Sequence, residues 1–225
     1  MVLNWEVISQ ALPHLMNGAV LTIELTVSSV FFGVILGLIM ALGRLSGKKI
    51  IRILSSIYID FFRGTPLLVQ IFLVYFGIPQ VFHFQLPDNY QYIAGVLALS
   101  LNCGAYTAEI FRSGIQSIDY GQAEAARSLG MSQGQAMRYI ILPQAFKVVV
   151  PPLGNEFIAM LKDSCLVSII AIEELMYSGN IIVGRTFQPF PIYITVAFMY
   201  LCMTMVLSLL VNYTEKRLAK SDIRN

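Results

Sequence analysis

Five stretches of this chain are apolar over about twenty residues or more, and this feature limits most strongly what the chain can fold into. About 20 residues of helix, at about 1.5 Å each, cross the roughly 30 Å hydrocarbon core of a bilayer. Only 12% of the residues are charged, about half the share in a soluble domain. We therefore predict an all-α integral membrane protein, with five transmembrane helices at residues 17–42, 53–76, 92–111, 153–172 and 192–213.

Prolines and glycines add detail to these helices. Pro151 and Pro152 are expected just before the fourth helix, because proline lacks an N–H and suits a helix start. Gly33 and Gly37 in the first helix form a small-xxx-small pair, which allows a second helix to approach closely in lipid. The spacing does not identify that second helix.

Basic residues predict the orientation. They follow the first, third and fifth predicted helices, whereas the alternate connections carry only Arg185. Lys and Arg stay on the cytoplasmic side, so we expect the amino terminus outside and the carboxyl terminus inside. The first residues contain no Lys or Arg, so no cleaved signal peptide is expected, and the weakly amphipathic segment around Trp5 is predicted to lie in the membrane interface.

The remaining composition excludes some classes of partner. Cys103, Cys165 and Cys202 each lie in an apolar run without metal-ligand spacing, so we interpret them as small core residues and predict no metal site. A net charge of +2 is too small to indicate nucleic acid binding.

The longest polar stretch, residues 112–150, is predicted to be cytoplasmic and to contain two short helices. Asp119 with Gln122, and Ser132 with Gln135, have the spacing of capping boxes. Gly130 stands between them, where a helix end favours a residue that tolerates positive φ. We therefore expect helices at 120–129 and 132–141, with a turn at Gly130.

The first of these short helices has a surface of small residues, Ala123, Ala125 and Ala126, flanked by Glu124 and Arg127. Such a helix buries too little apolar area to form a core, and it suits a groove on another protein. A solvated linker helix is the alternative, and the residues by themselves leave both open.

The run EAARSLGMSQGQAMRYIILP resembles the EAA motif of bacterial ABC importer permeases. That motif is EAA, three residues, Gly, nine residues and Ile-x-Leu-Pro. Its fixed positions are all present, at Glu124, Ala125, Ala126, Gly130, Ile140, Leu142 and Pro143. The runs RGTPLLVQ and, from Asn155 to Ser164, NxxIxxxKDS resemble signatures of the polar amino acid uptake branch of that family.

The resemblance implies one transmembrane domain over residues 1–225, in a bacterial inner membrane. Ala123, Glu124, Ala125, Ala126, Arg127 and Gly130 would form a coupling helix that docks on a separate ATPase. The implied partners are an ATPase dimer, a second permease subunit, an extracellular substrate-binding protein and an amino acid. The chain has no G-x-x-x-x-G-K-[ST] sequence, so it is expected not to be an enzyme, and ATP and Mg²⁺ would bind to the ATPase.

Charges inside the predicted helices point to a substrate site. Glu24 stands in an apolar run with polar neighbours on its helix, and Lys162 and Asp163 lie in the fourth helix. A surplus carboxylate would match a cationic substrate, so we predict basic amino acids: arginine, lysine or histidine. The candidate substrate contacts are Glu24, Asp163, Asn17, Thr22, Ser28, Asn102, Tyr106 and Lys162. The alternative is that Glu24 pairs with Lys162 and that no site exists in the helices.

Other charged residues have structural interpretations. Asp60 and Arg63 are three residues apart and are predicted to pair on one helix face. Glu109 is expected to reach water at the cytoplasmic interface. Glu156 is expected near a helix start, where a negative charge is favoured.

Two other functions are alternatives for a chain with charges inside apolar helices. An ion-gradient-driven secondary transporter could use Glu24 and Asp163 as proton carriers, but the chain is short and lacks repeated halves. A membrane-embedded enzyme would need a catalytic motif, and neither HExxH nor GxSxG occurs.

Overall fold

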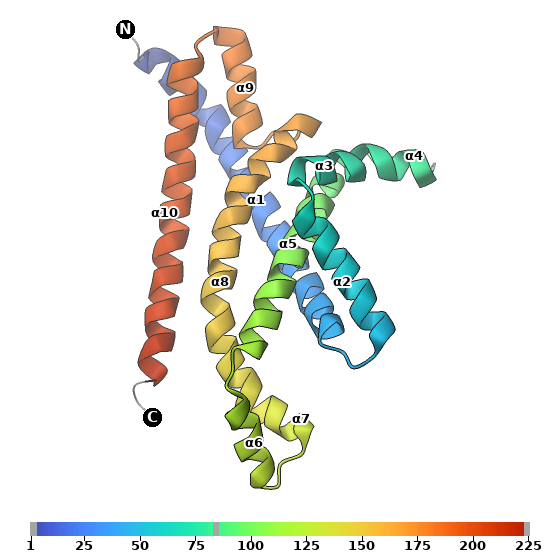
Figure 1. Cartoon of the computed structure of the whole chain (residues 1–225). Coiled ribbons are helices and arrows are strands. Elements are labelled where there is room, and N and C mark those ends of the chain that lie inside the picture. Colours follow the sequence, from blue (N-terminus) through green and yellow to red (C-terminus); the bar gives the residue numbers. More distant parts are fainter. Residues whose placement is uncertain (1–3, 83–85, 223–225) are drawn as a thin grey trace.

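A computed structural model describes residues 4–82 and 86–222, and every regular element in these residues is a helix (Figure 1). The α-helices are α1 (Trp5–Arg44), α2 (Lys49–Gly64), α3 (Leu67–Phe72), α4 (Ile78–Phe82), α5 (Tyr90–Gln116), α6 (Tyr120–Ser128), α7 (Gln133–Ala136), α8 (Leu142–Asp163), α9 (Leu175–Thr186) and α10 (Pro189–Asp222). Two π-helical segments (Leu73–Gly77 and Met137–Ile141) and a 3₁₀ segment (Ser164–Ile170) continue neighbouring helices.

Three described helices, α1, α5 and α10, are long and apolar enough to cross a membrane by themselves. Two further crossings require bent pairs. The α2 helix and the α3–α4 segment meet at 112°, and the helical segment ending at Ile170 meets α9 at 49°. The apolar runs therefore fold into helices, but two of the five are not single rods.

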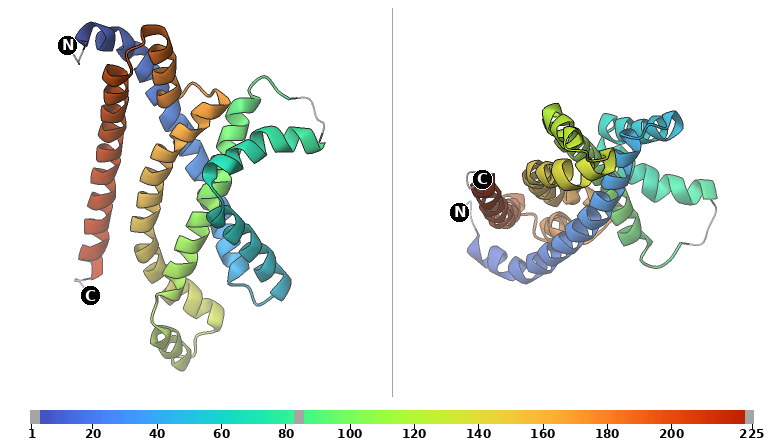
Figure 2. Two further views of the ribbon diagram at one scale, coloured as in Figure 1. Left: turned by 45° about the horizontal axis from the view of Figure 1, so that its top comes forward. Right: turned by 90° about the horizontal axis from the view of Figure 1, so that it is seen from below.

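The α1 helix starts earlier than predicted and is continuous with the segment that we expected to lie in the interface. Its polar residues do not interrupt the backbone hydrogen bonds, since a helix tolerates them wherever they face outward. Pro13 lies inside the helix, where it removes one hydrogen bond. The amino-terminal turns, dark blue in Figure 2, bend away from the rest of α1.

The seam between α1 and α5 confirms the predicted close approach at Gly33 and Gly37, and it identifies α5 as the second helix. A Cβ atom built on Gly33 would lie 2.7 Å from Cβ of Cys103, and one on Gly37 would lie 1.9 Å from Oγ1 of Thr107. The Thr107 hydroxyl also donates to the carbonyl of Gly33 at 3.2 Å. This packing excludes side chains larger than hydrogen at both glycines.

The prediction of a single second helix at 53–76 is wrong. The helix α2 ends at Gly64, and Thr65 is extended, with φ −118° and ψ 150°. Proline disfavours the helical conformation of the preceding residue, and Pro66 follows Thr65. The α3–α4 arm therefore turns away from α2 (Figure 1).

The fourth predicted helix, 153–172, is also wrong in its limits. The helix α8 begins at Leu142 and contains Pro151 and Pro152 in its interior. After Asp163 the chain tightens into the 3₁₀ segment, and Ala171 then takes the left-handed conformation (φ 60°) before α9. The predicted fifth helix, by contrast, lies within α10.

The core lies between α1, α3, α5 and the α8–3₁₀ segment, with fully buried Leu25, Ile71, Leu99 and Val167. The α10 helix stands at the edge, alongside α8 and α9 and opposite the α3–α4 arm (Figure 2). Only 6% of its most apolar window is buried within the chain. Most of the side chains in this window are therefore not covered by the rest of the chain.

Candidate functional site

The segment between α5 and α8 folds back as a hairpin of α6 and α7, at the opposite end of the molecule from α9 (Figure 1). The Asp119 carboxylate accepts a hydrogen bond from the Gly121 N–H at 2.6 Å and caps α6. Gly130 has φ +83°, which confirms the predicted turn. The α6–α7 hairpin thus begins and turns where the sequence predicted.

The second capping box is confirmed in full. The Gln135 N–H donates to Ser132 Oγ at 3.3 Å, and the Ser132 N–H donates to Gln135 Oε1 at 2.8 Å. The first box is not formed: the Asp119 side chain accepts from the Gly121 N–H and not from the Gln122 N–H, and Gln122 Oε1 instead accepts from Gln144 Nε2 of α8 at 3.4 Å. The second short helix ends at Ala136 and continues through a π segment into α8, so it is not separate as predicted.

The outer surface of α6 is small and partly apolar. Ala126 is buried and Ala123 is half-buried, whereas Glu124, Ala125 and Arg127 are exposed. Beside them, Leu129 is 84% exposed and Tyr120 is 71% exposed. A groove of about 350 Å³ runs between the end of α5 and the hairpin, with Asp119, Tyr120, Ala123, Arg127, Gln133 and Met137 in its lining. A surface of this kind suits a protein partner.

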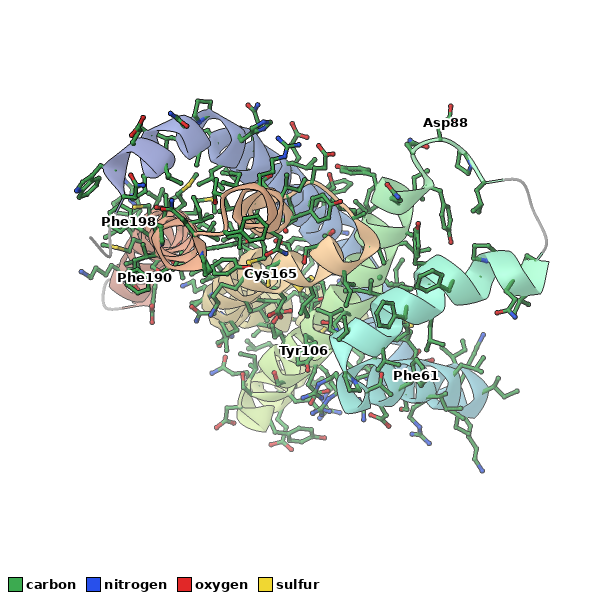
Figure 3. The ribbon with its side chains drawn as sticks, turned by 90° about the horizontal axis from the view of Figure 1, so that it is seen from above. Phe61, Asp88, Tyr106, Cys165, Phe190 and Phe198 are labelled. Carbon is green, nitrogen blue, oxygen red and sulfur yellow. The ribbon has the colours of Figure 1, made fainter. Side chains whose placement is uncertain are left out.

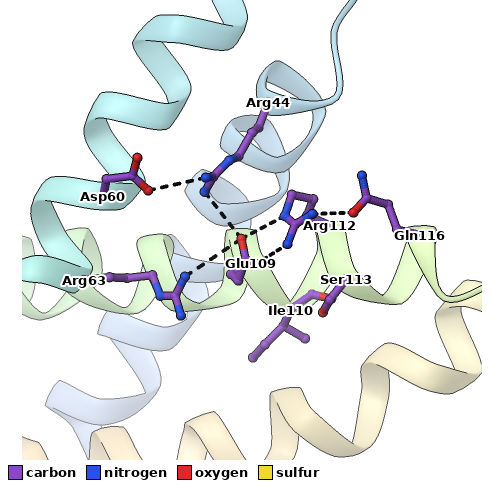
Figure 4. A network of polar contacts seen from close by, with 8 residues as sticks. All are labelled: Arg44, Asp60, Arg63, Glu109, Ile110, Arg112, Ser113 and Gln116. Carbon is purple, nitrogen blue, oxygen red and sulfur yellow. Dashed lines mark hydrogen bonds and ion pairs between the residues drawn. The ribbon is translucent and has the colours of Figure 1, made fainter.

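Above the hairpin, Glu109 of α5 joins three arginines from three helices (Figure 4). Its carboxylate lies 3.4 Å from Arg44 Nη1 of α1 and 3.9 Å from Arg63 Nη1 of α2. Arg112 of α5 donates from Nε at 2.9 Å and makes a second ion pair with the same carboxylate. The prediction that Glu109 merely reaches water is therefore wrong.

Asp60 and Arg63 do not pair as predicted. Asp60 pairs with Arg44 at 3.4 Å, while Arg63 pairs with Glu109 and also lies 5.5 Å from the ring centre of Tyr106. Both side chains find partners on neighbouring helices, which a spacing rule for one helix cannot reveal.

The candidate substrate residues on α1 lie in different surroundings. Glu24 and Asn17 are exposed, and Ser28 is half-buried. Ser28 lines an apolar groove of about 510 Å³ between α1 and α5. Thr22 is fully buried, donates to the Gly18 carbonyl at 3.0 Å and accepts from the Leu175 N–H at 3.1 Å, so its hydroxyl is used within the chain.

The two candidates on α5 are also engaged. Asn102 is buried, and its Nδ2 donates to Gln70 Oε1 at 2.9 Å. Tyr106 is 39% exposed and lies beneath the Arg63 guanidinium. Figure 3 places Tyr106 toward the middle of the molecule, between Phe61 of α2 and the α10 residues Phe190 and Phe198.

Lys162 and Asp163 are exposed in the last turn of α8. Lys162 lines a groove of about 340 Å³ shared with α9 and α10, together with Cys165 and Tyr200. In the described part of the chain no ion pair joins Lys162 to Glu24, so the predicted alternative pairing is not formed. Glu156 is half-buried within α8, two turns before Asp163, and not at the helix start that we expected.

The cysteines are only partly core residues. Cys103 is buried and Cys165 is intermediate, but Cys202 is exposed on α10, so the prediction is wrong for Cys202. Among residues 4–82 and 86–217, no group of three or more His, Cys, Asp or Glu side chains is arranged to hold a metal ion.

Two buried polar residues at the helix breaks were not among the sequence-based candidates. Gln70 donates to the Phe62 and Thr65 carbonyls at 2.8 and 3.0 Å, at the end of α2. Glu174 is fully buried and accepts from the Met176 and Tyr177 N–H groups, at the start of α9. The residues Gly64–Pro66 indicate the first break in the sequence. The second break depends on Ala171, which takes the left-handed conformation although it is not a glycine.

Comparison with known families decides which kind of protein carries this arrangement. The family described as binding-protein-dependent transport system inner membrane component matches residues 33–220. The chain belongs to this family. Membership favours a binding-protein-dependent transport component over the ion-gradient-driven secondary transporter and the membrane-embedded enzyme.

Individual transport components are similar over almost their whole length. The probable glutamine ABC transporter permease protein GlnM of Bacillus subtilis (strain 168) is 42% identical over 206 residues, 92% of this chain and 94% of GlnM. The L-cystine transport system permease protein TcyB of the same strain is 41% identical over 216 residues, 95% of this chain and 91% of TcyB. A solved structure is also similar, the crystal structure of an amino acid ABC transporter with histidines. One chain in it is 44% identical to this chain, with a TM-score of 0.90, over 96% of this chain and 100% of that one.

Proposed function

We propose that this chain is the permease subunit of an ATP-driven amino acid importer and that the α6–α7 hairpin couples it to a separate ATPase. The observation that carries the proposal is the outer surface of α6, where Leu129 is 84% exposed beside exposed Ala125 and Glu124. A leucine so exposed outside the apolar spans loses the benefit of burial until a partner covers it. The sequence of this hairpin resembles the EAA motif, which supports the same partner.

The family description supports a multi-subunit assembly. We propose an ATPase dimer on the cytoplasmic side, a second permease subunit within the membrane and a substrate-binding protein outside. ATP and Mg²⁺ then belong to the ATPase, because the chain has no P-loop sequence. Five crossings, with the amino terminus outside, agree with the excess of Lys and Arg near the α6–α7 hairpin.

In the proposed importer, the substrate pathway runs past the two broken helices. Discontinuous helices in membrane transporters surround substrate sites near the bilayer centre, because unwound backbone needs polar partners. Here the two breaks lie at Thr65–Pro66 and at Ala171–Glu174. ATP-driven movement of the α6–α7 hairpin would rotate the helices about these breaks and alternate access between the two sides.

For the cargo we propose a cationic amino acid: arginine, lysine or histidine. Asp163 and Glu24 are exposed carboxylates, and Lys162 forms no ion pair with Glu24 among the described residues. Two carboxylates and one ammonium leave a negative surplus, which favours a cation. Relatives are named for glutamine and for cystine, so the specificity needs its own test.

The coupling is tested by Ala125→Arg, which places a long cation on the exposed surface of α6. The permease is produced with its ATPase and binding protein and reconstituted in liposomes. We expect ATP-driven uptake to fall at least about tenfold, as when a central interface position is disrupted, with loss of the co-purified ATPase. Gly47→Arg, an exposed position in the loop between α1 and α2 with nothing within 4 Å of its Cβ, is the matched control and should leave uptake unchanged. Normal uptake by Ala125→Arg would overturn the docking of α6.

The cargo is tested by competition against labelled arginine in the same liposomes. Inhibition by lysine and histidine but not by glutamine supports the cationic specificity. Asp163→Asn and Glu24→Gln should then each weaken arginine uptake about fivefold to tenfold, the order expected for loss of one charged contact. Equal inhibition by glutamine would discard the cationic proposal and keep the importer.

A further inference from the structure

The cluster around Glu109 brings three guanidinium groups to one carboxylate. One carboxylate serves three arginines, which come from the last turn of α1, the last turn of α2 and α5 itself (Figure 4). The side chains of the cluster are not sealed, since Glu109 is 24% exposed and Arg63 is 39% exposed. The cluster therefore joins three helices through contacts that water can reach.

Two of these arginines have alternative partners. Arg44 lies 3.4 Å from Asp60 of α2 and 3.4 Å from Glu109 of α5. Arg63 lies 3.9 Å from Glu109, with the Tyr106 ring 5.5 Å away. Arg44 can therefore move between two carboxylates, and Arg63 between a carboxylate and an aromatic ring, without leaving the cluster.

The third arginine links the carboxylate to the α6–α7 hairpin. Arg112 binds Glu109 on one side and the side chain of Gln116, the last residue of α5, on the other. Only Ser117, Ile118 and Asp119 separate α5 from α6, and the Ser117 hydroxyl donates to the Gly114 carbonyl at 2.8 Å. A displacement of α6 thus passes directly to the turn of α5 that carries Glu109.

We propose that Glu109 is a positioning residue for transport: it ties the coupling hairpin to α1 and α2, and Arg44 and Arg63 exchange partners when the helices switch conformation. Repacked ion pairs at helix contacts are a known element of such transitions. The inference rests on the proposed function, because it presumes that a partner moves α6. It adds the route by which that movement reaches helices that α6 does not touch.

The test is Glu109→Gln, which keeps the shape of the side chain and removes its charge. The full transporter is reconstituted, and the amount of amino acid imported per ATP hydrolysed is measured. We expect this ratio to fall at least about fivefold, the lower range of measured coupling between sites, while ATP hydrolysis continues. Glu215→Gln, an exposed carboxylate on α10, is the matched control and should keep the ratio.

A role of the charge is separated from a purely structural role by a variant that keeps the charge. Glu109→Asp should retain at least half of the ratio that Glu109→Gln loses. Equal losses in Glu109→Asp and Glu109→Gln, or an unchanged ratio in Glu109→Gln, would overturn the inference. If Glu109→Gln does not fold, Arg63→Gln replaces it with the same expected loss. Failure of the proposed function appears separately, because Ala125→Arg would then retain its ATPase and its uptake.

Discussion

The long helices α1 and α5 pack their backbones in one way, and the two broken crossings pack theirs in the opposite way. The α1–α5 seam uses the absence of side chains, with Gly33 and Gly37 against Cys103 and Thr107. The breaks use large buried polar side chains instead, Gln70 after α2 and Glu174 before α9. Unbroken helices satisfy their own backbone, whereas a break exposes groups that need a partner.

The two breaks also differ from each other in a way that follows the direction of the helix. A helix end with free carbonyls needs donors, and the Gln70 amide supplies them to Phe62 and Thr65. A helix start with free N–H groups needs acceptors, and the Glu174 carboxylate supplies them to Met176 and Tyr177. The negative charge of Glu174 also suits the positive end of the helix dipole.

The largest effect is expected at Glu174. Glu174→Leu leaves two N–H groups of α9 and the Tyr200 hydroxyl, which donates to Glu174 at 2.8 Å, without their acceptor. Each unpaired buried group costs about 1–3 kcal/mol, so we expect a loss of about 4 kcal/mol. Thermal unfolding of the detergent-purified protein measures it. Glu174→Gln, which keeps an acceptor oxygen, should lose less than half as much, and equal losses would contradict the role of Glu174 as a cap.

A smaller loss is expected when the seam is filled. The Cβ of Gly37→Ala would lie 1.9 Å from Thr107 Oγ1 and 2.9 Å from the Gly104 carbonyl oxygen, so α1 and α5 must separate. Overpacking of this kind costs about 1–3 kcal/mol. Gly77→Ala is the matched control, since nothing lies within 4 Å of its Cβ. The same unfolding measurement should show Gly77→Ala unchanged, and a stable Gly37→Ala would show that the seam can yield.

The smallest effect is expected for the single hydrogen bond between Gln70 and Asn102, about 1 kcal/mol. Gln70→Leu removes this bond together with the donor to two carbonyls, so the bond has to be isolated from the other losses. Because the two side chains bond to each other, Gln70→Leu and Asn102→Leu together should cost less than the sum of the single losses. Simple additivity in this double-mutant cycle would mean that the Gln70–Asn102 bond contributes little to the break.

The sequence predicted those features that are encoded locally. The apolar runs, the Gly33–Gly37 seam, the Gly130 turn and the Ser132 capping box need only neighbouring residues to specify them. The ion pairs of Arg63 and Glu109 could not be predicted in this way, because the partners come from other helices. The same holds for Glu174, whose neighbours along the chain give no sign of a helix break.

The residues of the candidate site also differ in how far local sequence could predict their surroundings. The surface of α6 follows from its own residues, and the exposed Ala125 and buried Ala126 agree with a helix that presents one side to a partner. The substrate candidates depend on tertiary placement, so Thr22 and Asn102 turned out to be bonded within the chain. Asp163 and Glu24 stay candidates for the proposed substrate site.

The hydroxyl of Thr22 also bears on the order in which the chain is built. It accepts from the N–H of Leu175, a residue 153 positions later. Until that residue has been synthesised, α1 must stand in the bilayer without α9. It can do so because Thr22 donates to Gly18 and Thr26 donates to Thr22 within the helix itself. The first helix can therefore enter the membrane with the Thr22 and Thr26 hydroxyl donors satisfied, and Thr22 Oγ1 remains free to accept the Leu175 N–H when α9 packs against it.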